Sequence, residues 1–385
     1  SDLIHTDQKG FLKGRYIGEN IRLVVDLIES AESKQIEGLL MQCDFLKAYD
    51  SISWEYLNRV IKSYGFGPNF QRWMSVFYPS HAHSATINVN NFLSPRFKIE
   101  RGIRQGCPLS CLIWILCMEP LLRKIRTSDV IRGITVARSE IKVTAYADDL
   151  TVILDGSEAS LRNALAVFEE FREGSGLQLN LSKTTCTWFG RGSQQRDPIC
   201  ADLNLKWTRE GEPLDLLGVK IFADSNRTRE VNYSKKIEEI EKAMSPWTQR
   251  SLTPLGRVLL VKSILLAKFV HLFAVIENPE KAYMTRLESL IFKFIWGKKD
   301  KIKRGVAKKQ FIDGGIGAPD VEVFANALKV AWIKRWLGSD NSSWKLLVND
   351  NFQITENINV FQCQLGDLQI RQRQLPKFWE QVLTA

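Results

Sequence analysis

The spacing of apolar residues changes near residue 230, and this change limits the folds that the chain can adopt. Before it, strand-like runs alternate with segments of helical period; after it, only helical periods occur. We predict helices over 18–31, 54–64, 109–125, 157–173, 235–244, 254–275, 279–296 and 321–337, strands over 36–45, 141–146, 151–154, 177–189 and 214–222, and a hairpin within 85–99. The sequence therefore predicts an α+β region followed by an all-helical region.

The charge follows the same division. The 385 residues carry 53 Lys and Arg against 43 Asp and Glu, a net charge of +10. Residues 231–385 hold 24 of the basic and 15 of the acidic residues, whereas residues 1–230 hold 29 and 28. A basic helical region suits a polyanion, either nucleic acid or an anionic membrane, although a solvated Lys-rich surface would explain the charge equally well.

Composition excludes several other classes of protein. A hydrophobic content of 44% with 25% charged residues argues against a disordered or fibrous chain. The seven cysteines form no C-x-x-C pair and the four histidines do not cluster with them, so no zinc site is expected. No apolar run reaches the roughly 18 residues of a transmembrane helix. The odd cysteine count favours a reducing, intracellular compartment.

Two adjacent carboxylates interrupt a predicted hairpin at Tyr146-Ala147-Asp148-Asp149. An ordinary Asp-containing turn is the plain alternative, but the apolar strands on both sides predict a turn close to a sheet. Asp44 ends the predicted strand 36–45 and, taken alone, would be a strand-terminating surface residue. If this strand lies beside the hairpin, the three carboxylates converge and can bind two Mg²⁺ ions for phosphoryl transfer.

A glycine-containing loop, R-G-I-R-Q-G-C-P-L-S, spans residues 101–110. Its glycines permit the close approach of another backbone or a planar ligand, and Gln105 offers an amide. Arg101 and Arg104 offer planar donors for phosphate. The alternative is a connecting loop that leads into a helix beginning at Pro108.

Together these segments resemble the reverse transcriptases of LINE-type (non-long-terminal-repeat) retrotransposons. D-F-L-K-A-Y-D-S at 44–51, the 101–110 loop and Y-A-D-D at 146–149 match three palm motifs of that family in wording and order. The resemblance extends over nearly the whole chain. It includes D-Q-K-G-F-L-K-G-R at 7–15, L-N-L-S-K-T at 179–184, L-L-G-V at 216–219, L-G-R-V at 255–258, F-I-W at 294–296 and G-G-I-G-A-P-D at 314–320.

The resemblance implies a right-hand polymerase fold. Residues 1–230 would form partial fingers and a palm with a ferredoxin-like antiparallel sheet. Residues 231–310 would form a basic helical thumb, and residues 311–385 a helical extension after it. The family's R-P-I-S-like fingers segment is not found before Asp44. The implied enzyme is an RNA-directed DNA polymerase, a nucleotidyltransferase that extends a primer 3′-hydroxyl with dNTPs on an RNA template.

The resemblance also implies roles for residues near the carboxylates. Asp44, Asp148 and Asp149 would bind two Mg²⁺ ions, with Mn²⁺ as a substitute, and the Phe45 carbonyl would face the metal that carries the nucleotide. Tyr49 would be an aromatic gate against ribose, although it could instead be a core residue at the start of a helix.

Further roles follow the same resemblance. Gln105 and Gly106 would line the nucleotide pocket, with Arg101 near the triphosphate or template. Lys183 would act as general acid near the leaving pyrophosphate, and Leu217 with Gly218 would form the primer grip; a solvated lysine and a plain strand end are the alternatives. Phosphate contacts are expected from a basic cluster in the thumb: Lys298, Lys299, Lys301, Lys303 and Arg304.

The implied partners are an RNA template, a DNA primer in nicked target DNA, and dNTPs, without a membrane. We expect the chain to be the core of a larger polyprotein with an endonuclease domain, working in the nucleus, with a cytoplasmic ribonucleoprotein stage. Two alternatives remain open: an inactive RNA-binding remnant, against which the intact carboxylates argue, and an RNA-dependent RNA polymerase, against which Tyr49 and Y-A-D-D argue.

Overall fold

The computed structural model describes residues 3–79, 83–193, 196–297, 299–352 and 375–385. The chain divides into two compact units, Ser1–Glu210 with Asn341–Leu347 and Gly211–Asp340 with Val348–Ala385. The boundary predicted at residue 230 falls inside helix α7 (Ser225–Thr248). The observed boundary between the two units lies about twenty residues earlier, between Glu210 and Gly211. The predicted division into three domains stays a prediction.

A five-stranded sheet forms the centre of the first unit, in the order β11-β10-β1-β9-β8. Its strands are β1 (Glu37–Cys43), β8 (Val143–Tyr146), β9 (Asp149–Leu154), β10 (Thr185–Gly190) and β11 (Lys206–Trp207). The central strand β1 pairs antiparallel with both β9 and β10, and only β10 and β11 are parallel. The predicted antiparallel palm sheet with helices is confirmed.

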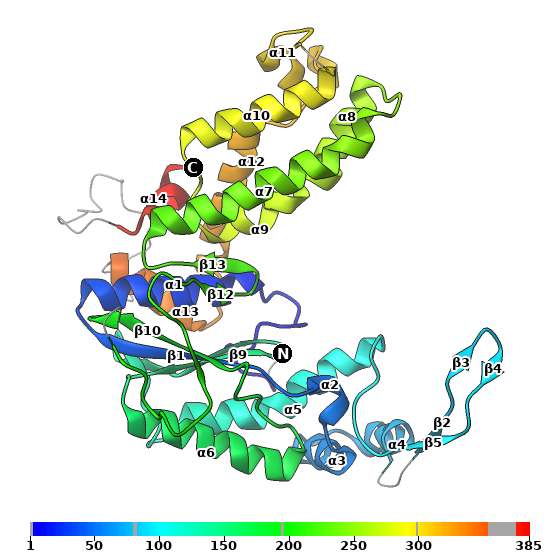
Figure 1. Ribbon diagram of the computed structural model, residues 1–385, viewed down its shortest axis with the longest axis vertical. Coiled ribbons are helices and arrows are strands. Elements are labelled where there is room, and N and C mark those ends of the chain that lie inside the picture. The colour runs from blue at the N-terminus through cyan, green and yellow to red at the C-terminus, as the bar shows by residue number, and fades with distance from the viewer. Residues whose placement is uncertain (1–2, 80–82, 194–195, 298, 353–374) are drawn as a thin grey trace. The chain divides into compact units, whose positions relative to one another are not determined.

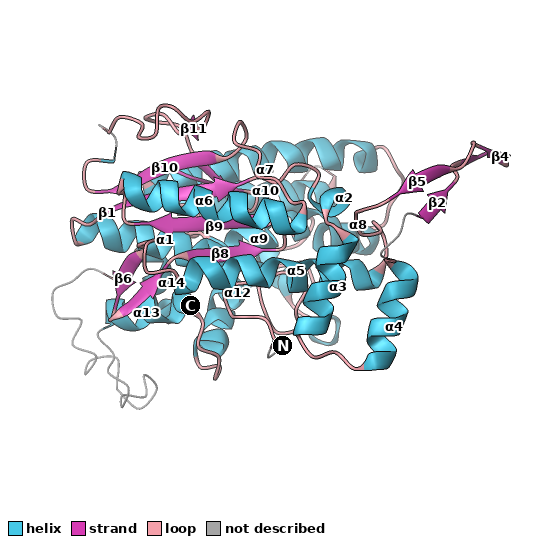
Figure 2. Ribbon diagram, turned by 90° about the horizontal axis from the view of Figure 1, so that it is seen from below, coloured by secondary structure: helices cyan, strands magenta, loops and turns pink. Residues whose placement is uncertain are grey.

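Three long helices cover this sheet, with α1 (Ile17–Ser33) on one face and α5 (Pro108–Thr127) and α6 (Glu158–Ser175) on the other (Figures 1 and 2). Pro108 stands at the first turn of α5, where its missing N–H costs nothing. Helix α6 begins at the Ser157 cap, whose hydroxyl accepts the Ser160 N–H, and ends at the left-handed Gly176. The helices bury apolar faces against the sheet.

Shorter elements complete the first unit: α2 (Ala48–Ser51), α3 (Trp54–Ser63), α4 (Pro68–Phe77), β2 (His83–Ala85), β3 (Asn88–Val89), β4 (Phe92–Leu93), β5 (Phe97–Ile99), β6 (Ile134–Val136) and β7 (Ser139–Ile141). Strands β2–β5 form the predicted hairpin, which projects from the helices in Figure 2. Asn90 and Asn91 both have left-handed φ, as a two-residue hairpin turn requires. The predicted strand 177–189 is a continuous strand only from Thr185, because residues 178–180 pair with residues 44–46 after β1 and residues 181–183 form a turn.

The second unit is a hairpin followed by helices. Its elements are β12 (Leu214–Leu216), β13 (Val219–Ile221), α7, α8 (Pro254–Leu260), a π-helical turn (Val261–Leu265), α9 (Ala267–Val275), α10 (Lys281–Trp296), α11 (Arg304–Lys308), a 3₁₀ turn (Phe311–Asp313), α12 (Val321–Trp336) and α14 (Lys377–Thr384). Helix α13 (Ser343–Phe352) begins in the first unit and ends in the second. Stacked rings of Tyr233, Phe269 and Phe273 lie in the core of the second unit.

One predicted helix of the second unit, 254–275, is interrupted by the π-helical turn. Within the described ranges, no single helix has the length and apolar composition to cross a membrane. Helix α8 with the π turn, taken together with α9, meets those criteria, but the two parts are bent by 46° relative to each other.

Candidate active site

The three predicted carboxylates meet at one end of the sheet. Cys43 at the end of β1 pairs with Leu150, so Asp44, which follows Cys43, lies across from Asp149, which precedes Leu150. Tyr146 pairs with Asp149, which leaves Ala147 and Asp148 as the two-residue turn between β8 and β9. The strand register, rather than nearness in sequence, therefore brings Asp44 to Asp148 and Asp149.

The charge of this cluster is not neutralised by the protein. Burial and the carboxylates of Asp148 and Asp44 raise the pKa of Asp149 above its usual value. Across the described ranges, no Lys, Arg or His forms an ion pair with any of the three, and no group of three His, Cys, Asp or Glu side chains is arranged so that it could hold a metal ion as it stands. Carboxylate oxygens with excess negative charge nevertheless fit Mg²⁺, which prefers oxygen ligands and keeps several waters.

Asp44 is held by the segment that follows α6. The Asn180 side-chain amide donates to Asp44 Oδ2 at 3.1 Å, and the Asn180 backbone N–H donates to the Asp44 carbonyl at 2.7 Å. The Lys183 N–H donates to the Asn180 carbonyl, so the exposed Lys183 lies in the turn that contacts Asp44. The sequence predicted a function for Lys183 in this motif but not for Asn180, whose amide is the group that contacts a carboxylate.

Two predicted substrate-binding residues pack on α5. Phe45 is buried against Trp114 and Phe168. Tyr49 is half-buried in α2 and stacks on Trp114 with ring centroids 4.9 Å apart and an interplanar angle of 16°. Burial, with Asp148 among the nearby charges, raises the pKa of the Tyr49 phenol, so its hydroxyl stays neutral. Trp114 therefore fixes the position of a neutral aromatic ring close to the carboxylates.

The 101–107 loop is joined to the segment after Asp44. The Ile103 N–H donates to the Tyr49 carbonyl at 2.7 Å, and Gln105 donates to the Asp50 carboxylate at 3.2 Å. Gly102 has a left-handed φ of 89°, and a Cβ there would lie 2.9 Å from the Asp50 carbonyl oxygen. Only glycine fits this close approach without movement of α2.

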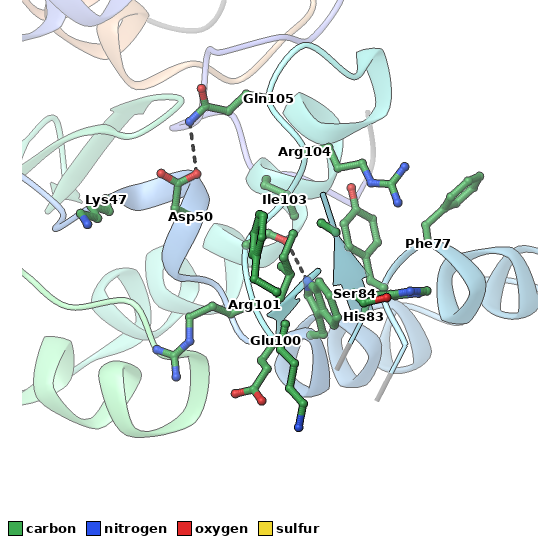
Figure 3. A pocket seen from close by; sticks show the side chains of 17 residues that line it. Lys47, Asp50, Phe77, His83, Ser84, Glu100, Arg101, Ile103, Arg104 and Gln105 are labelled. Carbon is green, nitrogen blue, oxygen red and sulfur yellow. Dashed lines mark hydrogen bonds between the residues drawn. The ribbon is translucent and has the colours of Figure 1, made fainter. Parts of the chain in front are cut away.

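A cavity of about 890 Å³ opens beside this loop (Figure 3). Its wall includes the predicted Arg101 and Gln105, together with Lys47 and Asp50, which our sequence analysis did not single out. Gln105 points toward Asp50 (Figure 3), whereas Gly106 and the three carboxylates are not among the described residues that line the cavity. Gly106, which was predicted to line the nucleotide pocket with Gln105, does not line this cavity, and its role stays a prediction.

Within the second unit, the predicted primer-grip residues form the turn between β12 and β13. Leu217 and Gly218 both have left-handed φ, 47° and 82°. The Leu217 carbonyl lies 3.0 Å from Nε2 of His271 on α9. Burial lowers the pKa of His271, so a neutral imidazole donates this hydrogen bond. His271 is a supporting residue that the sequence did not reveal, because it lies 54 positions from its partner.

The predicted basic cluster follows α10. Lys299, Lys301 and Lys303 are exposed, and Lys298 lies outside the described residues. Arg304 is engaged within the protein, since it donates to Asp300 at 2.8 Å and lies over the Phe292 ring. Its role as a phosphate contact therefore competes with an existing ion pair, whereas the three exposed lysines present their charge to solvent.

Comparison with known proteins adds independent findings. Residues 2–221 match the family described as "Reverse transcriptase (RNA-dependent DNA polymerase)". The "Transposon TX1 uncharacterized 149 kDa protein" of Xenopus laevis is 25% identical over 93% of this chain and 27% of its own length. The "Retrovirus-related Pol polyprotein from type-2 retrotransposable element R2DM" of Drosophila melanogaster is 26% identical over 69% of this chain and 25% of its own length.

The chain thus spans about a quarter of the length of these curated relatives. Among solved structures, a telomerase from Candida tropicalis in complex with a fragment of telomeric RNA aligns over 90% of this chain and 54% of that chain. Its TM-score is 0.40 at 10% identity, too low to carry an argument.

Proposed function

This chain belongs to the reverse transcriptase family, and from that membership we propose that it is an RNA-directed DNA polymerase that extends a primer 3′-hydroxyl with dNTPs on an RNA template. The predicted resemblance to LINE-type retrotransposon enzymes is confirmed by the family match and by relatives named as retrotransposon proteins. The observation that supports catalysis is the convergence of Asp44, Asp148 and Asp149, with no cation of the described chain to neutralise them.

Divalent metal ions serve the family in general, and the finer proposal is two Mg²⁺ ions, or Mn²⁺ in their place, held by Asp44, Asp148 and Asp149. Bound there, the ions would supply the charge that stabilises the attacking and leaving oxygens of phosphoryl transfer. Asn180 orients Asp44 through its amide, and the antiparallel register of β1 and β9 keeps Asp44 across from the exposed Asp149.

The remaining residues of the site would act on the substrates. The Phe45 carbonyl would face the nucleotide, and the fixed ring of Tyr49 would exclude a ribose 2′-hydroxyl. Lys183, exposed in the turn beside Asp44, would protonate or neutralise the leaving pyrophosphate. Arg101 and Gln105 would contact the triphosphate or template from the cavity wall, Gly106 the nucleotide, and Leu217 with Gly218 the primer end.

The wider setting is also a proposal. The helical second unit carries most of the chain's net positive charge, and Lys299, Lys301 and Lys303 would contact nucleic-acid phosphates. Since the relatives named as Pol polyproteins are about four times longer than the matched segment, we propose that this chain is one part of a polyprotein with an endonuclease domain. Target-primed synthesis on nicked DNA in the nucleus, after a cytoplasmic ribonucleoprotein stage, would follow from that arrangement.

The test is dNTP incorporation on poly(rA)/oligo(dT) by Asp148→Asn and Asp149→Asn. Both should lose incorporation while RNA binding survives, because the carboxylates would hold metal and not template. Asp129→Asn, which changes an exposed aspartate after α5, is the matched control and should be fully active. Unchanged incorporation in either site variant would refute the metal assignment, and an inactive parent chain that binds RNA would favour the non-catalytic alternative.

A further inference from the structure

The turn that carries Asp148 and Asp149 has an unfavourable backbone conformation. Ala147 has a left-handed φ of 58°, a region in which an L-residue with a Cβ costs about 1–2 kcal/mol. A two-residue hairpin turn with positive φ at its first position ordinarily has glycine there. Because alanine is unfavourable in this conformation, a contact from outside the hairpin is expected to stabilise it. The conformation matters for the site, since the next two residues are the carboxylates of the proposed metal site.

Gln8, a residue 139 positions away, contacts this turn from the N-terminal segment. Its side-chain N–H donates to the Ala147 carbonyl at 3.1 Å, and its side-chain oxygen accepts the Ala147 N–H at 2.8 Å. The backbone N–H and carbonyl of Ala147 are thus both bound by the single side-chain amide of Gln8. The same oxygen accepts the Gly10 N–H at 2.8 Å, and the Gln8 side chain is completely buried. A buried amide with this many bonds has one orientation open to it.

The segment around Gln8 is itself anchored on the sheet edge. The Lys9 N–H donates to the Ala145 carbonyl at 2.8 Å, and the Ala145 N–H donates to the Asp7 carbonyl at 2.9 Å, so this segment pairs in parallel with β8. A Cβ on Gly10 would lie 2.6 Å from the Ala147 nitrogen, which shows how closely the segment approaches the turn.

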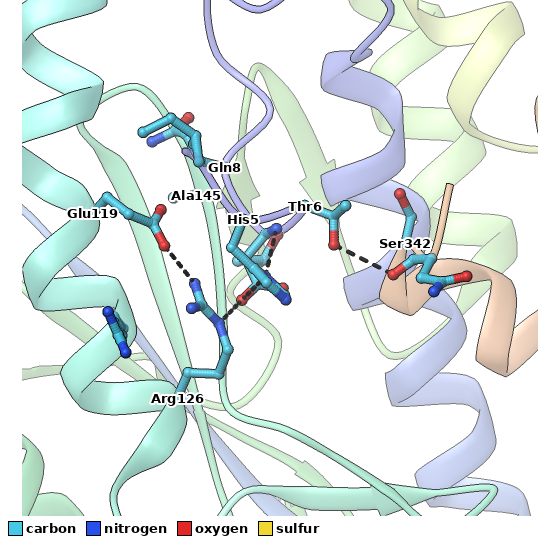
Figure 4. Close-up of polar contacts among 12 residues, drawn as sticks. His5, Thr6, Gln8, Glu119, Arg126, Ala145 and Ser342 are labelled. Atoms are coloured by element: carbon cyan, nitrogen blue, oxygen red, sulfur yellow. Dashed lines mark hydrogen bonds and ion pairs between the residues drawn. The ribbon is translucent and has the colours of Figure 1, made fainter. Parts of the chain in front are cut away.

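Ion pairs hold the segment from the other side (Figure 4). Arg126 of α5 contacts the Asp7 carboxylate at 2.6 Å and Glu119 at 3.2 Å, and His5 contacts Asp7 at 2.9 Å. Burial would raise the pKa of Asp7, but His5 and Arg126 hold it below its usual value, so Asp7 stays ionised and paired. The base from which Gln8 reaches the turn is therefore rigid.

We propose that Gln8 is a positioning residue for the metal-binding turn: its amide holds Ala147 in the left-handed conformation and so directs Asp148 and Asp149 toward Asp44. This inference rests on the proposed function for the identity of the site, and it adds a residue that acts through Ala147 without touching substrate. Groups that orient metal ligands commonly change metal affinity or activity by about 10–100-fold when they are replaced.

The test uses two shape-matched variants of the full chain. Gln8→Met keeps the length of the side chain and removes its hydrogen bonds. Asn20→Leu is the control, because Asn20 is also a buried amide that bonds to β8, through Thr144 and the Ala145 carbonyl, but does not touch the turn. Binding of Mn²⁺ alone, followed by the electron paramagnetic resonance signal of the free ion, reports on the site independently of polymerisation.

Gln8→Met should weaken Mn²⁺ binding about 10–100-fold and lower kcat with little change in the KM for dNTP. Asn20→Leu should lose thermal stability and keep the parent's Mn²⁺ affinity. Adding Ala147→Gly to Gln8→Met should recover part of the affinity, since glycine adopts positive φ without steric cost. If Gln8→Met does not fold, Gln8→Glu replaces it, because a carboxylate can accept from the two amides but cannot donate to the Ala147 carbonyl.

Equal Mn²⁺ affinities for Gln8→Met and Asn20→Leu, or no recovery in the double variant, would overturn the positioning role. Asp149→Asn is measured in parallel to separate the two proposals. If the parent chain binds RNA but incorporates no dNTP, the proposed function is wrong, and if Asp149→Asn retains incorporation, the metal assignment is wrong. If Asp149→Asn abolishes incorporation while Gln8→Met behaves like Asn20→Leu, only the role of Gln8 is wrong.

Discussion

Replacement of Gly102 by alanine tests whether the loop between β5 and α5 depends on its close backbone contact with α2. Two glycines of this loop, Gly102 and Gly106, have nearly the same left-handed φ, 89° and 80°. They differ in their surroundings, because a Cβ at Gly102 would lie 2.9 Å from the Asp50 carbonyl oxygen, whereas a Cβ at Gly106 would meet nothing within 4 Å. Gly106→Ala is therefore a matched control with the same change in conformational preference.

The loss of stability has two parts: the cost of a left-handed alanine and, at Gly102 only, the steric cost of its Cβ against the Asp50 carbonyl. A left-handed alanine costs about 1–2 kcal/mol relative to glycine at either position. Gly102→Ala adds an overpacking cost of about 1–3 kcal/mol, since the contact is with backbone that cannot rotate away. We expect Gly106→Ala to lower the free energy of unfolding by about 1–2 kcal/mol and Gly102→Ala by about 2–5 kcal/mol.

Urea denaturation followed by far-UV circular dichroism measures both changes, provided that the slope with urea is unchanged. Gly102→Ala should also weaken incorporation, because the displaced loop carries Ile103, which bonds to the Tyr49 carbonyl. Equal destabilisation by the two variants would show that the contact with Asp50 contributes nothing and that the reasoning from the 2.9 Å approach is wrong.

Three further predictions concern the site itself. Asp149 has a raised pKa in the folded chain, so its folded form binds a proton more tightly than the unfolded chain does, and ionisation at neutral pH destabilises the metal-free protein. Asn is neutral like protonated Asp149, so Asp149→Asn should raise the Tm in EDTA at pH 7. The gain in Tm should fade as the pH drops through the raised pKa of Asp149, and a gain that does not depend on pH would contradict the raised pKa. Asn180→Ala removes the amide that bonds to Asp44 and should weaken Mn²⁺ binding about 10–100-fold, whereas unaltered binding would show that Asp44 needs no orientation. Tyr49→Ala should increase NTP use relative to dNTP use and lose about 0.5–1.5 kcal/mol of stacking with Trp114. Tyr49→Phe should still discriminate against NTPs, and a Tyr49→Ala enzyme that also rejects NTPs would refute the role of Tyr49 as a gate against ribose.

The long elements of this fold could be predicted because their patterns persist over many residues. Helices α1, α5, α6 and α12 start and stop within a few residues of the prediction, since each buries a continuous apolar stripe. Helix α4 was not predicted, although Phe70, Trp73, Met74 and Phe77 recur in it at helical spacing; of this stripe only Met74 is fully buried. The π-helical turn inside 254–275 also leaves the apolar pattern unbroken.

The site divides in the same way. The three carboxylates could be predicted because each stands at the end of an apolar strand. Gln8, Asn180 and His271 could not, because each acts through a hydrogen bond from its side chain to a segment at least 54 positions away. Local spacing carries no record of such contacts, which depend on the register of the assembled sheet and the packing of the helices.

The pairing of Asp7–Lys9 with β8 has a consequence for solubility. Strand β8 is the last in the order of the sheet, and an unpaired edge is a template on which other chains can add strands. The N-terminal segment occupies the backbone groups of Ala145 on that edge, next to the turn that carries the carboxylates. Deletion of residues 3–10 should therefore expose an aggregation-prone edge, and a variant without this segment should self-associate at lower concentrations than the full chain.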